Sequence, residues 1–495
     1  MTNREVSYIS QGLKVWMNER RSTDNRGNET MEELTVDLVV IGAGPAGQKA
    51  AIQAAKFGKK VIVVDKLPEP GGNCLYTGTI PSKSLREAII DLTRFYERGF
   101  NSGEFAFQEV SIPQLNKRLH KVIEEERSTV YRQLKKNGIR ILNGTARFEN
   151  PHMLIIVDED YRLLYQIKTD FTIIATGSKP RNPNNVPFDS DVILDSTRLL
   201  NIERIPKSLI VLGGGIIGSE YASFFSALGT EVTVVDKKDH ILPLLDPEIG
   251  IVLQTALTDL GLHFIGNKEP IEIARKDNQA YVKCKDGTEL TADALLYALG
   301  RSAYVDGLHI ENAGLSVNDK GYIPVNALFQ TDRSNIYAVG DVIGGPCLAS
   351  TSMEQGRLAA RHAFGAHHSL FPALYPIGIY TIPEISSCGY NEDDLREMGF
   401  RYEVGRAYYY EIGRSHIVGS NTGMFKILFH AETLEILGIH IIGRSATEVI
   451  HIGQVAMSFG AKVDYFIDQV FNYPTYAEGY RIAALNGFNK IKYKK

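Results

Sequence analysis

The chain contains little cysteine and no apolar run long enough to cross a membrane. Its four cysteines, Cys74, Cys284, Cys347 and Cys388, are scattered through 495 residues without a C-x-x-C pair or a cluster with histidine. This usage argues against a secreted disulfide scaffold and a metal site, and it is typical of a reducing cytoplasm. The nearest candidate for a membrane span, 37–55, is interrupted by glycines, whereas a membrane helix needs ~18 uninterrupted apolar residues. We therefore expect a soluble, cytoplasmic protein without a bound metal.

An excess of either charge is also missing. The 54 Lys and Arg oppose 58 Asp and Glu, for a net charge of −4, and without a basic stripe nucleic acid is not an expected partner. Glycine, in contrast, is frequent, with 45 residues. This frequency indicates tight turns or a close approach of the backbone to a ligand.

A pattern of strand, glycine turn, helix and strand occurs twice, 171 residues apart. In the first copy a strand over 35–41 precedes a helix over 46–57 and a strand over 61–64. In the second copy a strand over 208–212 precedes a helix that ends at Leu228 and a strand over 232–235. Continuous apolar strands are typical of buried parallel sheets, so both copies predict dinucleotide-binding βαβ units.

Both turns carry the G-x-G-x-x-G fingerprint. Its first glycine permits the tight turn, the second lets the backbone approach a pyrophosphate, and the third lets the helix pack on the strand. An acidic residue about 20 positions further on is expected to bind a ribose hydroxyl. The first copy has Gly42, Gly44, Gly47 and Asp65, and the second has Gly213, Gly215, Gly218 and Asp236. Two dinucleotide sites are therefore predicted.

Asp236 bears on the choice of nucleotide. A carboxylate at this position accepts a hydrogen bond from the 2′-hydroxyl of NAD and repels the 2′-phosphate of NADP. Lys237, Lys238 and His240 follow and could offset that repulsion. We expect NAD at the second site, with NADP also accepted.

The order of these patterns predicts an α/β fold with two Rossmann-like domains and a C-terminal α+β domain. The expected parts are a polar extension over 1–33, the first part of one nucleotide domain over 34–180, a second nucleotide domain over 181–300, the remainder of the first over 301–371, and the α+β domain over 372–495.

The segment from Gly71 to Lys83, GGNCLYTGTIPSK, resembles the flavoprotein disulfide reductases, such as lipoamide dehydrogenase and glutathione reductase. Further landmarks of that family follow in order: Ala175-Thr176-Gly177, Glu220, Gly300-Arg301, the segment 337–341, and Pro474 to Glu478. The resemblance covers the chain from about Val36 to its end. It implies FAD in the first dinucleotide fold, a nicotinamide nucleotide in the second, and a C-terminal dimerisation domain that makes a homodimer or a higher homo-oligomer.

Two departures from that family exclude dithiol chemistry. Cys74 keeps the first thiol of the family's C-x-x-x-x-C motif, but the second position is Thr79, and a hydroxyl cannot form a disulfide. The family's C-terminal base is a histidine, and that position is Tyr473. A phenol with a pKa of ~10 is a poor proton shuttle at neutral pH.

One branch of the family matches both departures: the soluble, flavin-dependent pyridine nucleotide transhydrogenases. The similarity lies in Gly78 to Lys83, Phe471 to Thr475 and the segments 341–344, 348–350 and 483–487. It implies ping-pong hydride transfer through the flavin, with NADPH and NAD as substrates. Members of that branch have an uncharged residue at the position of Asp236, which makes dual specificity the open part of the interpretation.

The resemblance also implies site residues. Lys83, paired with Glu220, is expected to place a charge near flavin N5, and Glu478 is expected to orient Tyr473 across the dimer. The residues expected to bind FAD or the nicotinamide nucleotide are Gly42, Gly44, Ala46, Gly47, Asp65, Lys66, Gly72, Cys74, Thr79, Lys83, Ala146, Thr176, Gly177, Gly213, Gly215, Ile217, Gly218, Asp236, Gly300, Arg301, Gly340, Asp341, Leu348 and Ala349.

Several alternatives stay open. The Lys83–Glu220 pair could be only structural, Asp341 could cap a helix, and Arg301 could reach either nucleotide or face solvent. The enzyme could be a flavin diaphorase that reduces quinones or oxygen. It could instead be a nucleotide-binding regulatory protein that has lost turnover, although an intact charged pair argues against that function.

Overall fold

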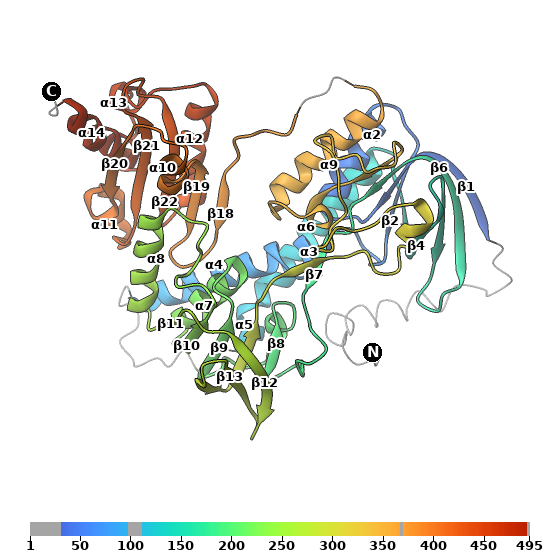
Figure 1. Cartoon of the computed structure of the whole chain (residues 1–495), viewed down its shortest axis with the longest axis horizontal. Helices are drawn as coiled ribbons and strands as arrows, with labels where there is room; N and C mark the ends of the chain where they lie inside the picture. The colour runs from blue at the N-terminus through green and yellow to red at the C-terminus, as the bar shows by residue number, and fades with distance from the viewer. Residues whose placement is uncertain (1–30, 98–110, 367–369, 493–495) are drawn as a thin grey trace.

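The computed structural model describes residues 31–97, 111–366 and 370–492. The expected extension over 1–33 therefore lies almost wholly outside the described residues. Three parts are evident in Figure 1: a sheet on the right, a second sheet below, and an α+β part at the upper left. The expected fold class, with two Rossmann-like folds and a C-terminal α+β part, is confirmed.

The first sheet has β1 (Glu32–Ile41) at its centre, between β2 (Val61–Asp65) and β6 (Leu163–Ile174), with both pairings parallel. β17 (Ile336–Ala338) also pairs with β6 in parallel and brings the segment after the second domain back to this sheet. The outer strands are β3 (Arg140–Asn143), β4 (Thr145–Asn150) and β5 (Met153–Val157). The two strands and the helix of the first predicted βαβ unit are present. The bounds of the helix and of the second strand agree with the prediction within one residue, and the first strand begins three residues earlier than predicted.

Helices α2 (Pro45–Lys56) and α9 (Ala349–Ala363) pack closely beside this sheet. A Cβ atom on Gly356 of α9 would lie only 2.1 Å from the carbonyl oxygen of Ala46 in α2, so the glycine permits the close approach of the two helices. The other helical elements of this part are α3 (Gly72–Tyr76), α4 (Thr79–Glu97), α5 (Ile112–Leu115), α6 (Lys117–Lys136), η3 (Ile310–Ala313) and η4 (Gly340–Ile343).

The second sheet has the order β11-β10-β9-β15-β8 and is parallel throughout. Its strands are β8 (Ile193–Asp195), β9 (Ser208–Leu212), β10 (Glu231–Val235), β11 (His263–Ile265) and β15 (Ala294–Tyr297), joined by η2 (Leu199–Asn201), α7 (Ile216–Ala227) and α8 (Pro247–Asp259). A meander of β12 (Pro270–Lys276), β13 (Gln279–Cys284) and β14 (Glu289–Ala292) follows. Strands β7 (Ser178–Pro180) and β16 (Arg301–Ala303) pair where the chain passes between the two nucleotide folds.

The C-terminal part is a five-stranded antiparallel sheet with helices. Its strands are β18 (Ile377–Ile379), β19 (Ile385–Gly389), β20 (Tyr402–Tyr408), β21 (Met424–His430) and β22 (Ile436–Ile442). Its helices are α10 (Glu392–Glu397), η5 (Tyr409–Glu411), α11 (Gly413–Val418), α12 (Ala446–Ser458), α13 (Asp464–Asp468) and α14 (Glu478–Lys492).

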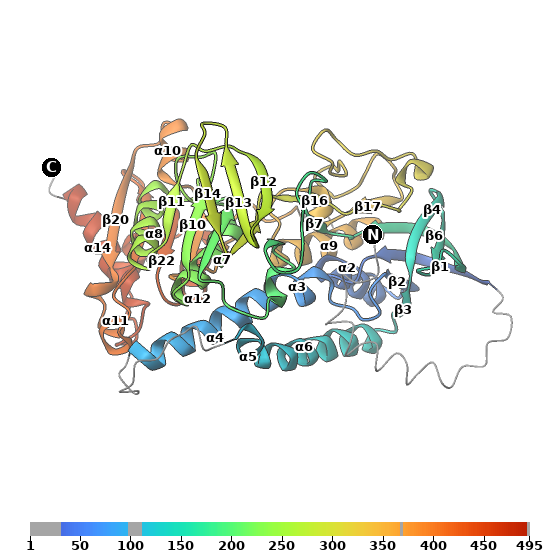
Figure 2. The ribbon, with the colours of Figure 1, turned by 90° about the horizontal axis from the view of Figure 1, so that it is seen from below.

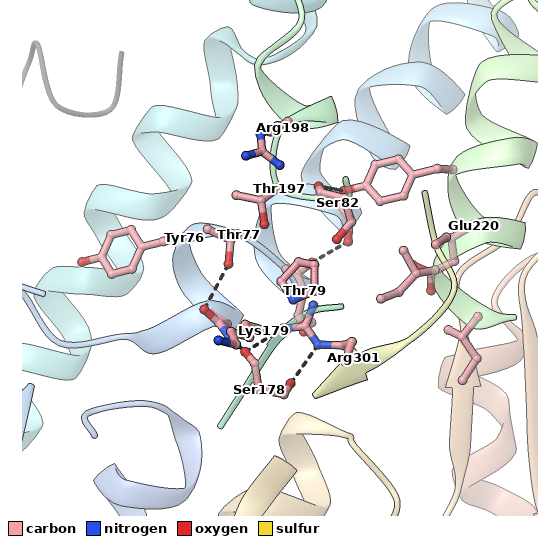
Figure 3. A pocket seen from close by; sticks show the side chains of 18 of the residues that line it. Tyr76, Thr77, Thr79, Ser82, Ser178, Lys179, Thr197, Arg198, Glu220 and Arg301 are labelled. Atoms are coloured by element: carbon pink, nitrogen blue, oxygen red, sulfur yellow. Dashed lines mark hydrogen bonds between the residues drawn. The ribbon is translucent and has the colours of Figure 1, made fainter. Parts of the chain in front are cut away.

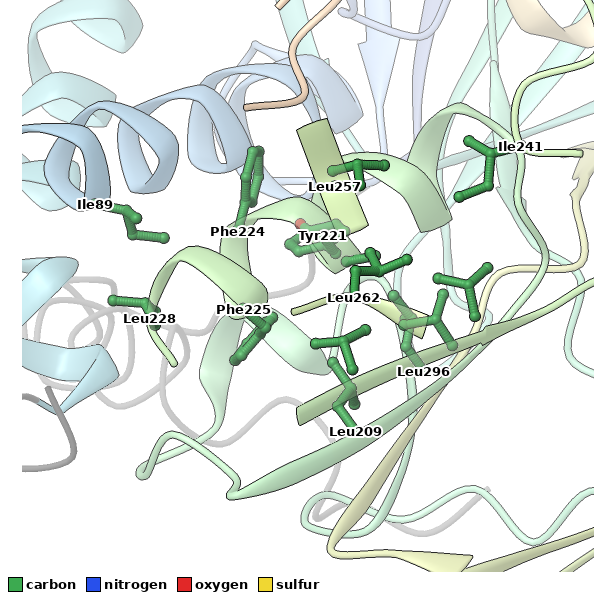
Figure 4. Packing of buried hydrophobic residues seen from close by; sticks show 14 of the residues in the cluster. Ile89, Leu209, Tyr221, Phe224, Phe225, Leu228, Ile241, Leu257, Leu262 and Leu296 are labelled. Carbon is green, nitrogen blue, oxygen red and sulfur yellow. The ribbon is translucent and has the colours of Figure 1, made fainter. Parts of the chain in front are cut away.

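Helix α4 connects the parts, and in Figure 2 it extends from α3 toward the C-terminal domain. Its buried Leu85 and Ile89 belong to the same hydrophobic cluster as Phe224 of α7 and Leu228, the C-cap of that helix. Figure 4 shows Ile89, Phe224 and Leu228. This contact fixes the start of α4 relative to α7. Among the helices of the described ranges, none combines the length and apolarity that a membrane crossing requires.

Candidate active site

A cleft of about 2530 Å³ lies between the two nucleotide folds. The carboxyl ends of β1 and β9, the first turns of α4 and α9, and the β7–β16 ribbon contribute to its walls. Pro376, Gly378 and Tyr380 of the C-terminal part also line it. Ligands of open α/β sheets bind at such carboxyl ends, so the cleft is the candidate active site.

Each glycine turn has a geometry that requires glycine. Gly42 and Gly213 have φ values of +107° and +105°, which side chains disfavour. A Cβ atom on Gly47 would lie 1.9 Å from the carbonyl oxygen of Gly42, and one on Gly218 would lie 1.9 Å from that of Gly213. The third glycine of each turn therefore serves helix packing, and neither Gly47 nor Gly218 lines the cleft.

The helices after these turns begin without a side-chain cap. Their N-cap residues, Gly44 for α2 and Gly215 for α7, both line the cleft. A Cβ atom on Gly72 would lie 2.7 Å from Cα of Gly44, so two glycines let the backbone of α3 approach the first turn. The free N–H groups and the helix dipole make each helix N-terminus suited to a phosphate.

Asp65 and Asp236 occupy equivalent positions at the ends of β2 and β10. Asp65 accepts hydrogen bonds from the backbone N–H groups of Ala43, at 2.6 Å, and Leu67, at 2.8 Å. Asp236 accepts them from Gly214, at 2.5 Å, and Lys238, at 2.8 Å. Both carboxylates thus brace their own glycine turn as well as lining the cleft. Burial raises the pKa of Asp65, although the two backbone N–H groups oppose this shift.

Lys83, in the first turns of α4, and Glu220, on α7, form an ion pair with Nζ 2.6 Å from Oε2. Glu220 is buried, and Figure 3 places it on α7 at one side of the cleft. Its other oxygen, Oε1, accepts a hydrogen bond from the backbone N–H of Tyr380 at 2.9 Å. Both carboxylate oxygens are therefore satisfied, and the ammonium is held at the cleft wall.

Ser178 links two other residues of the cleft, Arg301 and Asp341, and Figure 3 shows Ser178 beside Arg301. Arg301 Nε donates to Ser178 Oγ, and Nη2 donates to the Ser178 carbonyl oxygen, both at 2.8 Å. Ser178 Oγ in turn donates to Asp341 Oδ2 at 2.6 Å. Arg301 is thus tied into the site, and burial lowers its pKa. The N-cap of η4 is Val339, so Asp341 is not the helix cap that the sequence left open.

Cys74 is unpaired, and its thiol interacts with the side chain of Thr79. Burial raises the pKa of Cys74, which disfavours the reactive thiolate. Cys347 also lines the cleft, and burial raises its pKa to about 11. Neither thiol has the lowered pKa of a redox-active cysteine.

The structure brings most of the predicted binding residues to the cleft. Those that line it are Gly42, Gly44, Ala46, Asp65, Lys66, Gly72, Cys74, Thr79, Lys83, Thr176, Gly177, Gly213, Gly215, Ile217, Asp236, Gly300, Arg301, Gly340, Asp341, Leu348 and Ala349. Ala146, a residue of β4, does not line it, because its side chain is buried in a hydrophobic cluster with side chains of the other strands of the first sheet.

Tyr473 and Glu478 lie in the C-terminal domain, away from the cleft of their own chain. Tyr473 is 75% exposed. The buried Oε2 of Glu478 has no hydrogen-bond partner within the part of the chain that the structure describes, and burial raises the pKa of this carboxyl. One chain alone therefore does not bring these two residues together with Lys83.

Among the residues of the cleft that sequence reasoning missed are Ser178, Tyr304 and Tyr380. Ser178 directly follows the Ala175–Gly177 landmark, so its neighbours offered a signal. Tyr304 lies under the Lys66 ammonium, 3.6 Å from Nζ to the ring centroid. Tyr380 comes from another domain, and no motif in the sequence marks it.

Comparison with known proteins decides the family. Residues 36–356 match the family described as pyridine nucleotide-disulphide oxidoreductase, and residues 375–484 match its dimerisation domain. The chain belongs to this family. Membership makes it a flavoprotein oxidoreductase and confirms the expected dimerisation domain.

Relatives within this family share most of the chain. The soluble pyridine nucleotide transhydrogenase of Mycobacterium tuberculosis is 45% identical over 457 residues, 92% of this chain and 98% of the relative. The protein of the same name from Pseudomonas aeruginosa is 40% identical, over 92% of this chain and 98% of the relative. The resemblance to soluble pyridine nucleotide transhydrogenases is confirmed.

Two solved structures of the family have the same fold. The HOCl-induced flavoprotein disulfide reductase RclA from Escherichia coli is 28% identical with a TM-score of 0.81, over 90% of this chain and 99% of that chain. LpdA from Mycobacterium tuberculosis is 26% identical with a TM-score of 0.83, over 91% of this chain and 99% of that chain.

The residues present fit the FAD that the family implies. The uncapped helix at Gly44 and the glycine contact between Gly44 and Gly72 leave backbone open to a pyrophosphate. The buried Oγ1 of Thr176, at the cleft, has no hydrogen-bond partner among the described residues, as expected of a group that waits for a ligand.

Proposed function

We propose that this chain transfers a hydride between NADPH and NAD as a flavin-dependent transhydrogenase that lacks a redox-active disulfide. The observation that carries the proposal is the contact of Cys74 with Thr79 beside an intact Lys83–Glu220 pair. The chain keeps a fixed cation at the cleft but has threonine, not a second thiol, beside Cys74 at position 79. The names of the relatives from Mycobacterium tuberculosis and Pseudomonas aeruginosa support the same activity.

Each of the two glycine turns would bind one of the two dinucleotides. Gly42, Gly44 and Asp65 would hold FAD, with Ser178, Arg301 and Asp341 beside its middle portion. Gly213, Gly215 and Asp236 would hold the nicotinamide nucleotide. Bound FAD supplies the redox chemistry, because it can accept a hydride from one nicotinamide and give it to another. The net reaction, NADPH and NAD⁺ to NADP⁺ and NADH, moves one hydride and requires no proton.

The second nucleotide fold supports an exchange of the two substrates at one site. The described residues contain one such turn beyond the first, at Gly213 to Gly218, so the two nicotinamide nucleotides use it in turn. This is ping-pong exchange. Asp236 favours NAD at that turn, and the nearby Lys237 is paired with Glu269 at 2.8 Å. NADP therefore binds more weakly than NAD in this proposal.

The C-terminal domain supports a homodimer. Its match to the family's dimerisation domain makes a pair of chains the expected assembly, with Tyr473 and Glu478 at the surface between them. The four unpaired cysteines and the name "soluble" of the relatives are compatible with the cytoplasm as its location.

The experiment is the NADPH-dependent reduction of thio-NAD by the purified flavoprotein. Oxidised lipoamide and glutathione disulfide serve as parallel acceptors, and a quinone is a third. We expect rapid reduction of thio-NAD and none of either disulfide. Reduction of the quinone while thio-NAD stays unchanged would replace the proposal with a diaphorase.

A further inference from the structure

The segment 380–384 of the C-terminal domain meets both nucleotide folds beside the candidate active site. The backbone N–H of Tyr380 donates to Glu220 on α7, and that of Ile382 donates to Ser223 Oγ, at 3.1 Å, one helical turn further along α7. Arg86 of α4 donates from Nε to the carbonyl oxygen of Thr381, also at 3.1 Å. Three separate segments of the chain thus converge on this point.

A buried ion pair holds the segment in place. Arg86 Nη2 lies 3.0 Å from Glu384 Oε2, and neither side chain is more than 8% exposed. The other oxygen of Glu384 accepts from the N–H and hydroxyl of Thr447, at 3.3 and 3.2 Å. Arg86 lies three residues after Lys83 on α4, so both project from one face of the helix. The position of segment 380–384 and that of Lys83 are therefore linked through the same helix.

Tyr380 brings this anchored segment into contact with the ammonium itself. The Nζ atom of Lys83 lies 4.8 Å from the centroid of the Tyr380 ring, within the range of a cation–π contact. The hydroxyl at the far end of the ring interacts with Thr447, and burial raises its pKa, so it stays protonated. Both the ring and Lys83 line the cleft.

We propose that Tyr380 is a positioning residue that holds the Lys83 ammonium at its place in the cleft. A lysine is a point charge on a flexible four-carbon stem, and its ammonium donates here to Glu220 Oε2 at 2.6 Å and, over a longer 3.3 Å, to the adjacent Ser82 Oγ. The Tyr380 ring adds a contact from the C-terminal domain, and the Tyr380 N–H fixes the carboxylate that pairs with the ammonium. The C-terminal domain thereby takes part in the redox site. This inference rests on the proposed function only in placing that ammonium beside the bound flavin.

The test compares Tyr380→Leu with Tyr380→Phe, in the wild-type chain and with Lys83→Met. The leucine variant loses the ring but keeps the backbone N–H, whereas the phenylalanine variant keeps both and loses only the hydroxyl. The readouts on the holoenzyme are the midpoint potential of the flavin and its anaerobic single-turnover reduction by NADPH. A positive charge near a flavin favours its electron-rich reduced state. We expect Tyr380→Leu to shift the reduction equilibrium toward the oxidised form by about tenfold, or about 30 mV for a two-electron couple.

The background variant separates positioning from a general structural effect. If Tyr380 acts through Lys83, Tyr380→Leu adds no further shift in the Lys83→Met chain, because the two effects are not additive. Tyr380→Phe and the exposed control Tyr390→Leu should retain the wild-type potential. A second readout, on apoprotein, is acetylation of Lys83 by a water-soluble amine reagent, followed by mass spectrometry. This modification should be faster in Tyr380→Leu than in Tyr380→Phe.

Two results would overturn the proposal. One is a Tyr380→Leu potential equal to that of Tyr380→Phe, and the other is a shift that persists in full with Lys83→Met. Should Tyr380→Leu fail to fold, Glu384→Gln loosens the same segment from outside the cleft and must produce a smaller shift in the same direction. These measurements use NADPH alone, so their outcome is independent of whether NAD is the acceptor.

Discussion

Replacing Lys426 with methionine should destabilise the protein strongly and in a pH-dependent way. Lys426 lies on β21 with no exposed side-chain surface, and its Nζ contacts Asp246 at 2.7 Å, Glu248 at 3.0 Å and Glu392. Asp246 and Glu248 belong to the start of α8, and Glu392 begins α10. The ammonium therefore joins the second nucleotide fold to the C-terminal domain.

The magnitude follows from what the substitution leaves behind. Three carboxylates would remain, one of them fully buried, with Arg406 paired to Glu248 and Arg396 paired to Glu392 at the periphery. Removing one partner of a buried ion pair costs about 3–5 kcal/mol. At about 3 °C per kcal/mol for a domain of this size, we expect the unfolding midpoint at pH 8 to fall by about 9–15 °C.

The pH dependence has a definite sign. In the wild type, the hydrogen bonds of Lys426 help to hold the pKa values of Glu248 and Glu392 below their usual range against the opposing effect of burial. Their stabilisation is therefore present above the unfolded carboxyl pKa of about 4.3 and is lost as the pH falls. Without the ammonium, burial raises these pKa values, the native state binds more protons than the unfolded one, and stability falls as the pH rises. The deficit of Lys426→Met should thus be smaller at pH 5 than at pH 8.

The assay is thermal unfolding of the holoenzyme at both pH values, monitored by circular dichroism and by flavin fluorescence. Lys285→Met is the matched control, because Lys285 forms an exposed ion pair, 3.9 Å from Glu269, and exposed pairs contribute little. Lys426→Met/Asp246→Asn should recover part of the loss, since asparagine keeps the helix cap and removes one charge. A Lys426→Met midpoint equal to wild type at pH 8, or a deficit that grows at pH 5, would refute the reasoning.

Four further substitutions test the site. Gly47→Ala places a Cβ atom 1.9 Å from the Gly42 carbonyl oxygen and should yield protein without flavin absorbance at 450 nm. Gly218→Ala produces the same clash at Gly213, and this variant should keep its flavin absorbance but lose nicotinamide nucleotide binding in a dialysis assay. Asp236→Asn should lower the KM for NADPH relative to that for NADH by about tenfold, equivalent to ~1.4 kcal/mol, and an unchanged ratio in steady-state kinetics would remove Asp236 as the discriminating residue. Thr79→Cys should form a disulfide with Cys74 in air, so that three thiols instead of five are titrated in denaturant. The variant should still not reduce lipoamide, because Tyr473 remains in place of the family's histidine. Five free thiols would show that the two side chains cannot approach each other.

The glycine turns were predictable because every property they need is local. Turn, helix packing and acidic residue all lie within about 25 residues, and the same spacing at Asp65 and Asp236 predicted their shared place at the end of a strand. The sequence could not reveal that each carboxylate also accepts the N–H of its own turn, since this depends on the path of the chain after the strand.

Contacts between residues that are far apart in the sequence were harder to predict. The Lys83–Glu220 pair spans 137 residues and came from family resemblance, not from spacing. Tyr380 follows Lys83 by almost 300 residues, on a segment whose two short strands, β18 and β19, gave no clear alternation. Ala146 has a buried side chain and does not line the cleft, so a contact of its backbone with FAD stays a prediction.

Thr79 and Tyr473 depart from the dithiol pattern, but the chain retains the Lys83–Glu220 ion pair beside Thr79. Stability alone does not require the buried Glu220 and its partners, because well-packed apolar residues can replace a buried ion pair without loss of stability. A protein that had lost its redox role would therefore not need this pair. Here the carboxylate is satisfied from two different domains, and its ammonium lies at a cleft wall, where a purely structural pair has no reason to be. Threonine stands at position 79, where the proposed function requires no thiol, while the groups that hold a cation at the cleft remain. That combination favours hydride transfer between nucleotides over a retired binding protein.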